Sequence, residues 1–276
     1  MRKVDSEIIT KEISEAVQNA NFSLGKNIYN KIEKAIDKEK SPLGKNVLKN
    51  ISKNADIAEN EKLPICQDTG IVVVFVEIGN EVYIEGDLKD AINYGVKIGY
   101  NEGYLRKSVV GDPFKRENTD DNTPAVIYTE NVVGDQLKLH VLIKGAGSEN
   151  MSQIKMFNPT VEKKEIKKFI IDTVKKAGAN ACPPYILGVG IGGTFEKAAY
   201  LSKRALIKKE SNDKEIKEFE DDILKDVNKT GIGPGGLGGK ITALDVKVLT
   251  YPCHIASLPV AVNINCHVSR HITIEI

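Results

Sequence analysis

Short apolar runs rich in β-branched residues alternate with amphipathic helical patterns along this chain, and this alternation limits the possible folds most strongly. The longest clean apolar run is Ile71–Val76, which suits a buried strand. A membrane span needs about 20 apolar residues, so we expect no membrane partner. After this run, Asp87 can cap a helix that carries Leu88, Ile92 and Val96 at helical spacing. The chain is therefore predicted to be α/β, of the mixed α+β kind.

The first sixty residues differ from the rest because their apolar residues follow helical spacing only. Ile28, Ile32 and Ala35 form one apolar stripe, and Ser41-Pro42 is a typical helix start. No internal repeat is found. We predict a single domain over residues 1–276, with a helical segment at about 1–60 followed by mixed β-sheets flanked by helices.

Charge and cysteine content exclude several classes of protein. The 39 Lys and Arg residues almost balance the 38 Asp and Glu residues, so no global field favours nucleic acid. The start of the chain turns acidic before any apolar run, unlike a secretory signal. The four cysteines lie far apart in a chain of 276 residues and do not form a disulfide framework. We expect a cytoplasmic protein with reduced thiols.

One glycine motif raises the possibility of a dinucleotide site. Gly188–Gly193 matches G-x-G-x-x-G between an expected strand and an expected helix, and Glu210 lies where a ribose-binding acid would be. However, Leu201–Glu210 continues a helical pattern where a second strand should end, and two prolines precede the first strand. A dinucleotide-dependent oxidoreductase is therefore kept as the alternative from another class of enzyme.

A second glycine-rich segment, Gly231–Lys240, has two interpretations. It departs from the phosphate-binding Walker pattern, because Pro234 occupies the first glycine position and Ile241 replaces the Ser or Thr that binds magnesium. The segment is either a flexible turn or a stretch of backbone that closely approaches a ligand or partner.

Each of the four cysteines lies at the edge of an expected loop, and no C-x-x-C pair is present. Three thiolates from distant loops could hold a [4Fe–4S] cluster and leave one iron open as a Lewis acid for a substrate oxygen. Buried, inert thiols are the alternative. The residues alone leave both interpretations open.

Five segments occur here in the order in which they occur in one known family. They are Leu63-Pro-Ile-Cys-Gln-Asp-Thr-Gly70, Lys144-Gly-Ala-Gly-Ser-Glu-Asn150, Ala181-Cys-Pro-Pro-Tyr185, Gly235-Gly-Leu-Gly-Gly-Lys240, and Pro252-Cys-His254 followed by Pro259 and Asn265-Cys266. From about residue 5 to its C-terminus, the chain resembles the class I, iron–sulfur fumarate hydratases. The resemblance is to the alpha subunit of the two-subunit form, and the alpha subunit of iron–sulfur L-tartrate dehydratase is a close relative.

The resemblance implies a [4Fe–4S] cluster held by Cys66, Cys182 and Cys266, with Cys253 as an additional thiol. It further implies that a small dicarboxylate substrate is bound by five residues, namely Gln67, Asp68, Arg106, Gly147 and His254. Arg106 would clamp a carboxylate with its bidentate fork, and Gly147 would offer backbone N–H groups. Ala146 stands where the family often has a third glycine, a mild departure in this loop.

The implied reaction is the reversible hydration of fumarate to L-malate, or the corresponding dehydration of tartrate. Asp68 or His254 would position or protonate the leaving oxygen. We find no obvious base for the proton beside the other carboxylate. The resemblance implies that a separate beta subunit supplies it, in an α2β2 heterotetramer. A non-enzymatic iron–sulfur subunit is the third alternative.

Overall fold

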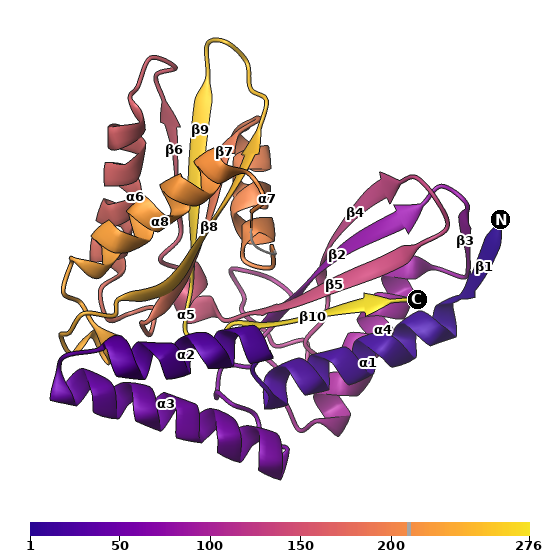
Figure 1. Cartoon of the computed structure of the whole chain (residues 1–276). Coiled ribbons are helices and arrows are strands. Elements are labelled where there is room, and N and C mark those ends of the chain that lie inside the picture. Colours follow the sequence, from indigo (N-terminus) through magenta and orange to yellow (C-terminus); the bar gives the residue numbers. More distant parts are fainter. Residues whose placement is uncertain (209–210) are drawn as a thin grey trace. The chain divides into compact units, whose positions relative to one another are not determined.

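The computed structural model describes residues 1–208 and 211–276 and confirms the predicted mixture of helices and strands (Figure 1). The chain divides into two compact units, each with its own four-stranded sheet. Unit 1 comprises Met1–Gly25, Asn54–Ala146 and Arg270–Ile276, and unit 2 comprises Lys26–Lys53 and Gly147–Ser269. None of the helices in the described residues is long and apolar enough to cross a membrane.

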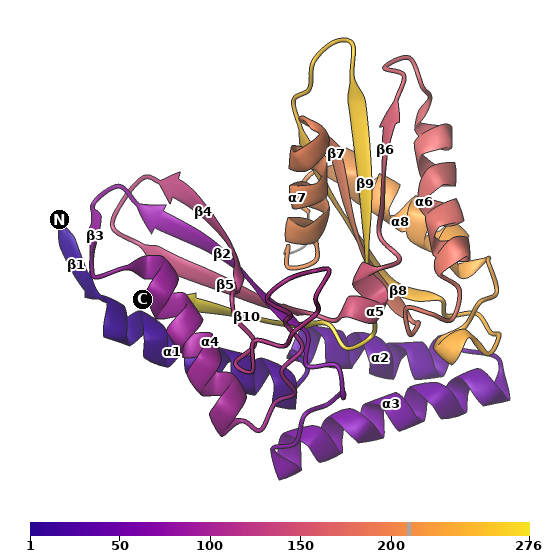
Figure 2. The same cartoon turned by 180° about the vertical axis from the view of Figure 1, so that it is seen from behind.

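Unit 1 is a mixed sheet with the strand order β10-β5-β2-β4, accompanied by two long helices (Figure 2). Its elements are β1 (Arg2–Asp5), α1 (Ser6–Phe22), β2 (Ile71–Gly79), β3 (Val82–Glu85), α4 (Leu88–Glu102), β4 (Val126–Val132), β5 (Leu137–Lys144) and β10 (Arg270–Glu275). The core forms where Val72, Val74 and Val76 of β2 meet apolar residues of α1 and α4. As predicted, Asp87 caps α4: its carboxylate accepts a 2.8 Å hydrogen bond from the backbone N–H of Asp90.

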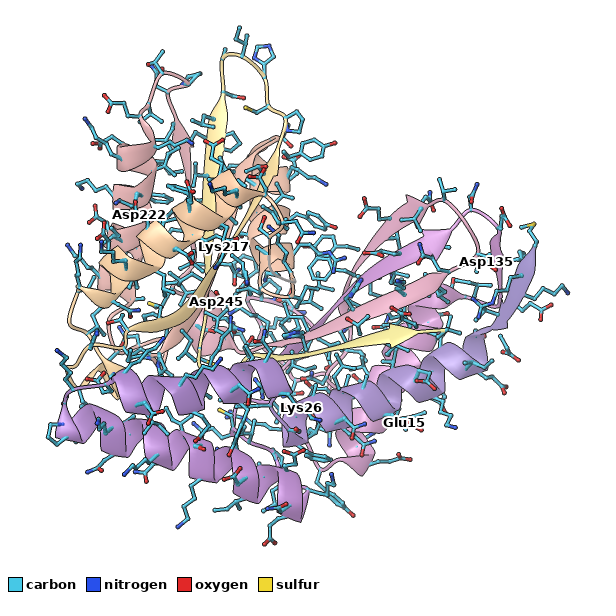
Figure 3. The ribbon with its side chains drawn as sticks, viewed as in Figure 1. Glu15, Lys26, Asp135, Lys217, Asp222 and Asp245 are labelled. Carbon is cyan, nitrogen blue, oxygen red and sulfur yellow. The ribbon has the colours of Figure 1, made fainter. Side chains whose placement is uncertain are left out.

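Unit 2 has three layers, with the sheet order β6-β9-β7-β8 in the middle. Its elements are α2 (Lys26–Lys38), β6 (Gln153–Phe157), α6 (Lys163–Ala177), β7 (Tyr185–Gly192), α7 (Phe195–Ala205), α8 (Lys214–Asn228), the 3-10 turn η1 (Pro234–Gly236), β8 (Ala243–Tyr251) and β9 (Leu258–Asn265). Helices α6 and α8 share the main core with the sheet, and Asp222 of α8, which is labelled in Figure 3, pairs with Lys167 of α6 at 2.8 Å. Helix α7 covers the opposite face (Figures 1 and 2). Two further helices, α3 (Pro42–Glu61) and α5 (Ala146–Glu149), include residues of both units.

Three short elements are not evident from the sequence pattern: β1, α5 and β6. Strand β6 lies at the edge of its sheet, and its side chains are half-buried or exposed, so they show no apolar alternation. Strand β1 buries only Val4 and forms by parallel pairing with β3. Long-range pairing, which leaves little local signal, therefore decides the two strands β1 and β6.

The G-x-G-x-x-G segment has a packing role in this fold. Its first two glycines lie inside β7, not in a turn after it. A Cβ atom at Gly188 would lie 2.0 Å from the carbonyl oxygen of Ser202, and one at Gly190 would lie 2.1 Å from that of Ala198. The glycines let α7 approach the strand closely, which favours packing over dinucleotide binding. Glu210, the acid of the dinucleotide hypothesis, lies outside the described residues.

Gly190→Ala should therefore lower the free energy of unfolding by about 1–3 kcal/mol, because the added methyl group overlaps helix backbone. Urea titration followed by circular dichroism measures this change. Gly25→Ala is the matched control, since a Cβ atom there meets no heavy atom within 4 Å. Equal stability of the Gly190→Ala variant and the unmodified chain would show that α7 does not depend on this close approach.

Candidate functional site

The first predicted ligand segment, residues 63–70, connects α3 to β2 in unit 1 and is fixed by its backbone. The N–H of Ile65 donates to the carbonyl of Asn21 at 2.9 Å, and the Asn54 side chain donates to the carbonyl of Ile65 at 2.9 Å. Cys66 is consequently held half-buried, next to the exposed Gln67. Gly70 has a φ of +72°, and a Cβ atom there would lie 2.9 Å from the Lys144 backbone, so only glycine fits.

The carboxylate of Asp68 is oriented by two backbone donors. One oxygen accepts from the N–H of Gly70 at 3.0 Å, and the other accepts from the N–H of Ala146 at 2.8 Å. These contacts tie the segment after Cys66 to the Gly-Ala-Gly loop. The carboxylate is half-buried and has a fixed direction, as a group that positions a substrate oxygen or its proton needs.

A pocket of about 260 Å³ opens beside Asp68 within unit 1. Its polar lining comes from Asp68, Ser108 and Lys144, and its apolar lining includes Ile71, Val109 and Val110. A pocket that combines an apolar wall with a few oriented polar groups suits a small organic acid.

Arg106 lies in the loop after α4, and its side chain is exposed. Its carbonyl oxygen accepts a 2.6 Å hydrogen bond from the hydroxyl of Thr69, the residue after Asp68. Unit 1 therefore brings Cys66, Gln67, Asp68 and Arg106 into one hydrogen-bonded group of loops, and the guanidinium is available to an anion.

Two buried residues that the sequence analysis did not single out support these loops. Tyr100 of α4 donates its hydroxyl to the carbonyl of Thr69 at 2.5 Å, and its burial raises the pKa of the hydroxyl, so the group stays a donor. The Asn122 side chain accepts from the N–H of Ser108 at 2.7 Å and donates to the carbonyl of Gly70 at 3.1 Å. In the sequence, Tyr100 belongs to an apolar helical stripe and Asn122 to a polar loop, so neither shows a functional signal.

The loops of Cys182 and Cys266 meet in unit 2. His267, next to Cys266, donates its backbone N–H to the carbonyl of Cys182 at 3.4 Å, and its Nδ1 lies 3.0 Å from the same oxygen. Cys182 is exposed and Cys266 is half-buried. Cys182 has a φ of 52°, a left-handed conformation that costs energy in a residue other than glycine and often occurs at functional sites.

Gly147 and His254 also belong to unit 2, but in different places. A Cβ atom at Gly147 would lie 3.8 Å from the carbonyl oxygen of Asn180, two residues before Cys182. His254 lies in the exposed loop before β9, whereas Cys266 follows β9 (Figure 1). Eight residues of strand span about 25 Å. Within its unit, the structure therefore does not bring His254 to the two cysteines.

The predicted cluster ligands are thiols, the donors that iron–sulfur clusters use, and none of the four cysteines is in a disulfide. Cys66 belongs to unit 1, and Cys182 and Cys266 belong to unit 2. Across residues 1–208 and 211–276, no three His, Cys, Asp or Glu side chains are gathered as a metal-binding group. The donor chemistry fits the cluster, and two of the three donor loops are joined.

Comparison with known sequences supports the resemblance. A sequence profile of the family described as Fumarate hydratase (Fumerase) matches residues 10–275, which is nearly the whole chain. The chain belongs to the fumarate hydratase family. The family resemblance predicted from the five segments is thus confirmed.

Relatives in the fumarate hydratase family carry names for two reactions. The chain is 40% identical to a Methanocaldococcus jannaschii protein provisionally named L(+)-tartrate dehydratase subunit alpha. The 272 aligned residues cover 95% of each chain. It is 30% identical to the L(+)-tartrate dehydratase subunit alpha of Escherichia coli strain UTI89, covering 77% of this chain and 72% of that protein. It is 32% identical to the aerobic class I fumarate hydratase of Salmonella typhimurium, covering 81% of this chain but 41% of that protein.

Proposed function

We propose that this chain is the alpha subunit of an iron–sulfur hydro-lyase that adds water reversibly across the carbon–carbon double bond of a small dicarboxylate. One observation carries the proposal: in a chain of this family, the Cys182 and Cys266 loops are joined through His267. The proposed ligands of the [4Fe–4S] cluster are Cys66, Cys182 and Cys266. We also propose that residues 1–276 function as a single domain.

A bound cluster would supply a Lewis-acidic iron that is not held by a protein ligand. The chain's own residues would do the remaining work in this half of the site. Arg106, exposed and carried on a loop bonded to Thr69, would bind a substrate carboxylate through its two-pronged guanidinium. Gln67 and the backbone N–H of Gly147 would donate hydrogen bonds to the substrate.

Asp68 is proposed as the group that positions and protonates the leaving oxygen. Its two backbone donors fix the carboxylate, and it lines the pocket of unit 1. His254 is kept as a second proposed substrate-binding and catalytic residue. Since it lies at the far end of β9 from Cys266, Asp68 is the first choice for the proton role.

A partner chain completes the proposal. Relatives are named as alpha subunits, which supports a beta subunit for this chain as well. We propose an α2β2 assembly in the cytoplasm in which the beta subunit supplies the base. The alpha chain alone would then bind the cluster but turn over little substrate.

Fumarate is the proposed substrate, with L-malate as its hydration product. L-tartrate is the second candidate, and one observation favours it: the 40% identical M. jannaschii relative matches over 95% of both chains and carries a tartrate name. Both candidates need the same dicarboxylate clamp, so a direct rate comparison separates them.

The test begins with anaerobic reconstitution of the chain with iron and sulfide, followed by brief mild oxidation and an EPR spectrum. The expected result is a [3Fe–4S] signal, which indicates three protein ligands and one lost iron. The complex purified from native extract is then assayed with fumarate and with L-tartrate. A well-folded chain that takes up no cluster, or a native preparation with no second subunit, would contradict the proposal.

A further inference from the structure

Glu39 is a buried carboxylate that the sequence analysis did not single out. It follows α2 in unit 2 and is 1% exposed. Its oxygens accept hydrogen bonds from the backbone N–H groups of Lys40 at 2.8 Å and Ser41 at 2.9 Å. They also accept from the N–H groups of Lys240 at 2.9 Å and Ile241 at 2.8 Å, two hundred residues further along the chain. Burial by itself would raise the pKa of Glu39, but these N–H donors together lower it, so the group is ionised at neutral pH.

The glycine-rich segment Gly231–Lys240 is shaped around this carboxylate. A Cβ atom at Gly239, which has a φ of +135°, would lie 2.9 Å from an oxygen of Glu39. The end of the segment therefore needs glycine in order to wrap the side chain. The Lys240 N–H at the end of this phosphate-loop-like stretch thus binds a carboxylate of the same chain. The segment does make a close approach, to Glu39 of its own chain, whereas the sequence analysis named a ligand or a partner as the target.

The middle of the same segment contacts the backbone around Cys182. The N–H of Gly235 donates to the carbonyl of Pro183 at 2.9 Å. A Cβ atom at Gly236 would lie 2.4 Å from the Cβ of Ala179, so the segment is in tight contact on both sides of Cys182. Between these two contacts Cys182 adopts its left-handed conformation. A strained residue of this kind persists only where its surroundings hold it.

We infer that Glu39 is a positioning residue which, through the glycine-rich segment 231–240, holds the 179–183 loop in the conformation that presents the Cys182 thiol to the cluster. The inference rests on the proposed function in one respect, namely that Cys182 is a cluster ligand. The link from Glu39 to the 179–183 loop concerns the chain without any cluster. Four backbone donors converge on one ionised group, and removal of its charge leaves the buried N–H of Ile241 and the three partly buried N–H groups without a full set of acceptors.

Glu39→Gln tests this link, because it removes the charge and replaces one acceptor oxygen by a donor at constant shape. Glu220→Gln is the matched control. Glu220 is also 1% exposed in unit 2 and accepts a 2.8 Å bond from a backbone N–H, but that N–H belongs to Val248 of β8. Hydrogen–deuterium exchange is measured by mass spectrometry on both variants and on the unmodified chain, all without cluster. The lifetime of the reconstituted cluster is measured separately under anaerobic conditions.

Glu39→Gln should accelerate amide exchange at least about tenfold in residues 235–241 and also in residues 179–185, and should shorten the cluster lifetime by a similar factor. Glu220→Gln should change neither region by more than about twofold. The inference fails if only residues 235–241 exchange faster, or if both variants loosen residues 179–185 equally. If the unmodified chain takes up no cluster, the proposed function fails, and the exchange data still decide whether Glu39 holds the Cys182 loop.

Discussion

Cys182→Ser should prevent the chain from retaining an iron–sulfur cluster, whereas Cys253→Ser should leave the cluster intact. The two cysteines are a matched pair, because both are exposed thiols in loops of unit 2. Only Cys182 lies in a loop bonded to the Cys266 segment. Loss of a ligating thiolate should weaken cluster binding by more than the roughly 100-fold that loss of an outer-shell group can cost. Iron and sulfide content after anaerobic desalting measures the difference.

The same change at Cys66 and at Cys266 should have the same effect as at Cys182, because each supplies one ligand in the proposed set. Circular dichroism of every variant before reconstitution shows whether the fold is retained. Cluster loss in Cys253→Ser together with cluster retention in Cys266→Ser would overturn the ligand assignment. Full iron content in Cys66→Ser would show that unit 1 does not contribute a ligand.

Asp68→Asn should lower kcat of the assembled enzyme by about 100- to 10,000-fold while the cluster content stays unchanged. The amide cannot donate and accept a proton as a carboxyl group does, but it has nearly the same shape and keeps one acceptor for the two backbone N–H groups. The rate with the preferred dicarboxylate and the iron content are measured on the same preparation. A loss of iron in proportion to the loss of rate would show that Asp68 has a structural role instead.

Asp121→Asn serves as the control for this experiment. Asp121 is another carboxylate in unit 1 that caps a loop, accepting from the N–H and the hydroxyl of Thr123 at 3.0 and 2.7 Å. It does not line the pocket beside Asp68. Its substitution should leave the catalytic rate within about twofold of the unmodified enzyme, because its carboxylate bonds to Thr123 and not to the Gly70 and Ala146 N–H groups that orient Asp68. An equal loss of activity in both variants would show that the effect is not specific to Asp68, and would contradict its proposed role in proton transfer.

Local patterns were sufficient to predict most of the elements that form the two sheets and their helices. The β-branched run at Ile71–Val76 is β2, and the helix capped by Asp87 is α4. The continuous apolar run of β2, and the apolar stripe and Asp87 cap of α4, are each encoded within a few neighbouring residues. The family was likewise evident from five ordered segments, and the position of each cysteine at a loop edge follows from the residues around it.

The interpretation of the glycine-rich segments required the tertiary structure. The G-x-G-x-x-G pattern at Gly188–Gly193 occurs both in nucleotide sites and where a helix packs closely on a strand, and the carbonyl oxygens of Ala198 and Ser202 beside these glycines show the second case. The role of residues 231–240 could be interpreted only once their contact with Glu39, which is distant in sequence, was known. The sequence around a backbone N–H group does not indicate which acceptor that group will bond in the folded chain.

The sequence by itself thus determined the mixed α+β class, the family and the set of thiols, because these depend on local periodicity and on short ordered segments. The tertiary structure decided which loops meet. It joined Cys182 to the Cys266 segment, placed His254 at the other end of β9, and connected Glu39 to the glycine-rich segment. Such contacts arise from hydrogen bonds and close approaches between residues tens to hundreds of positions apart, and nothing in the neighbouring sequence specifies them.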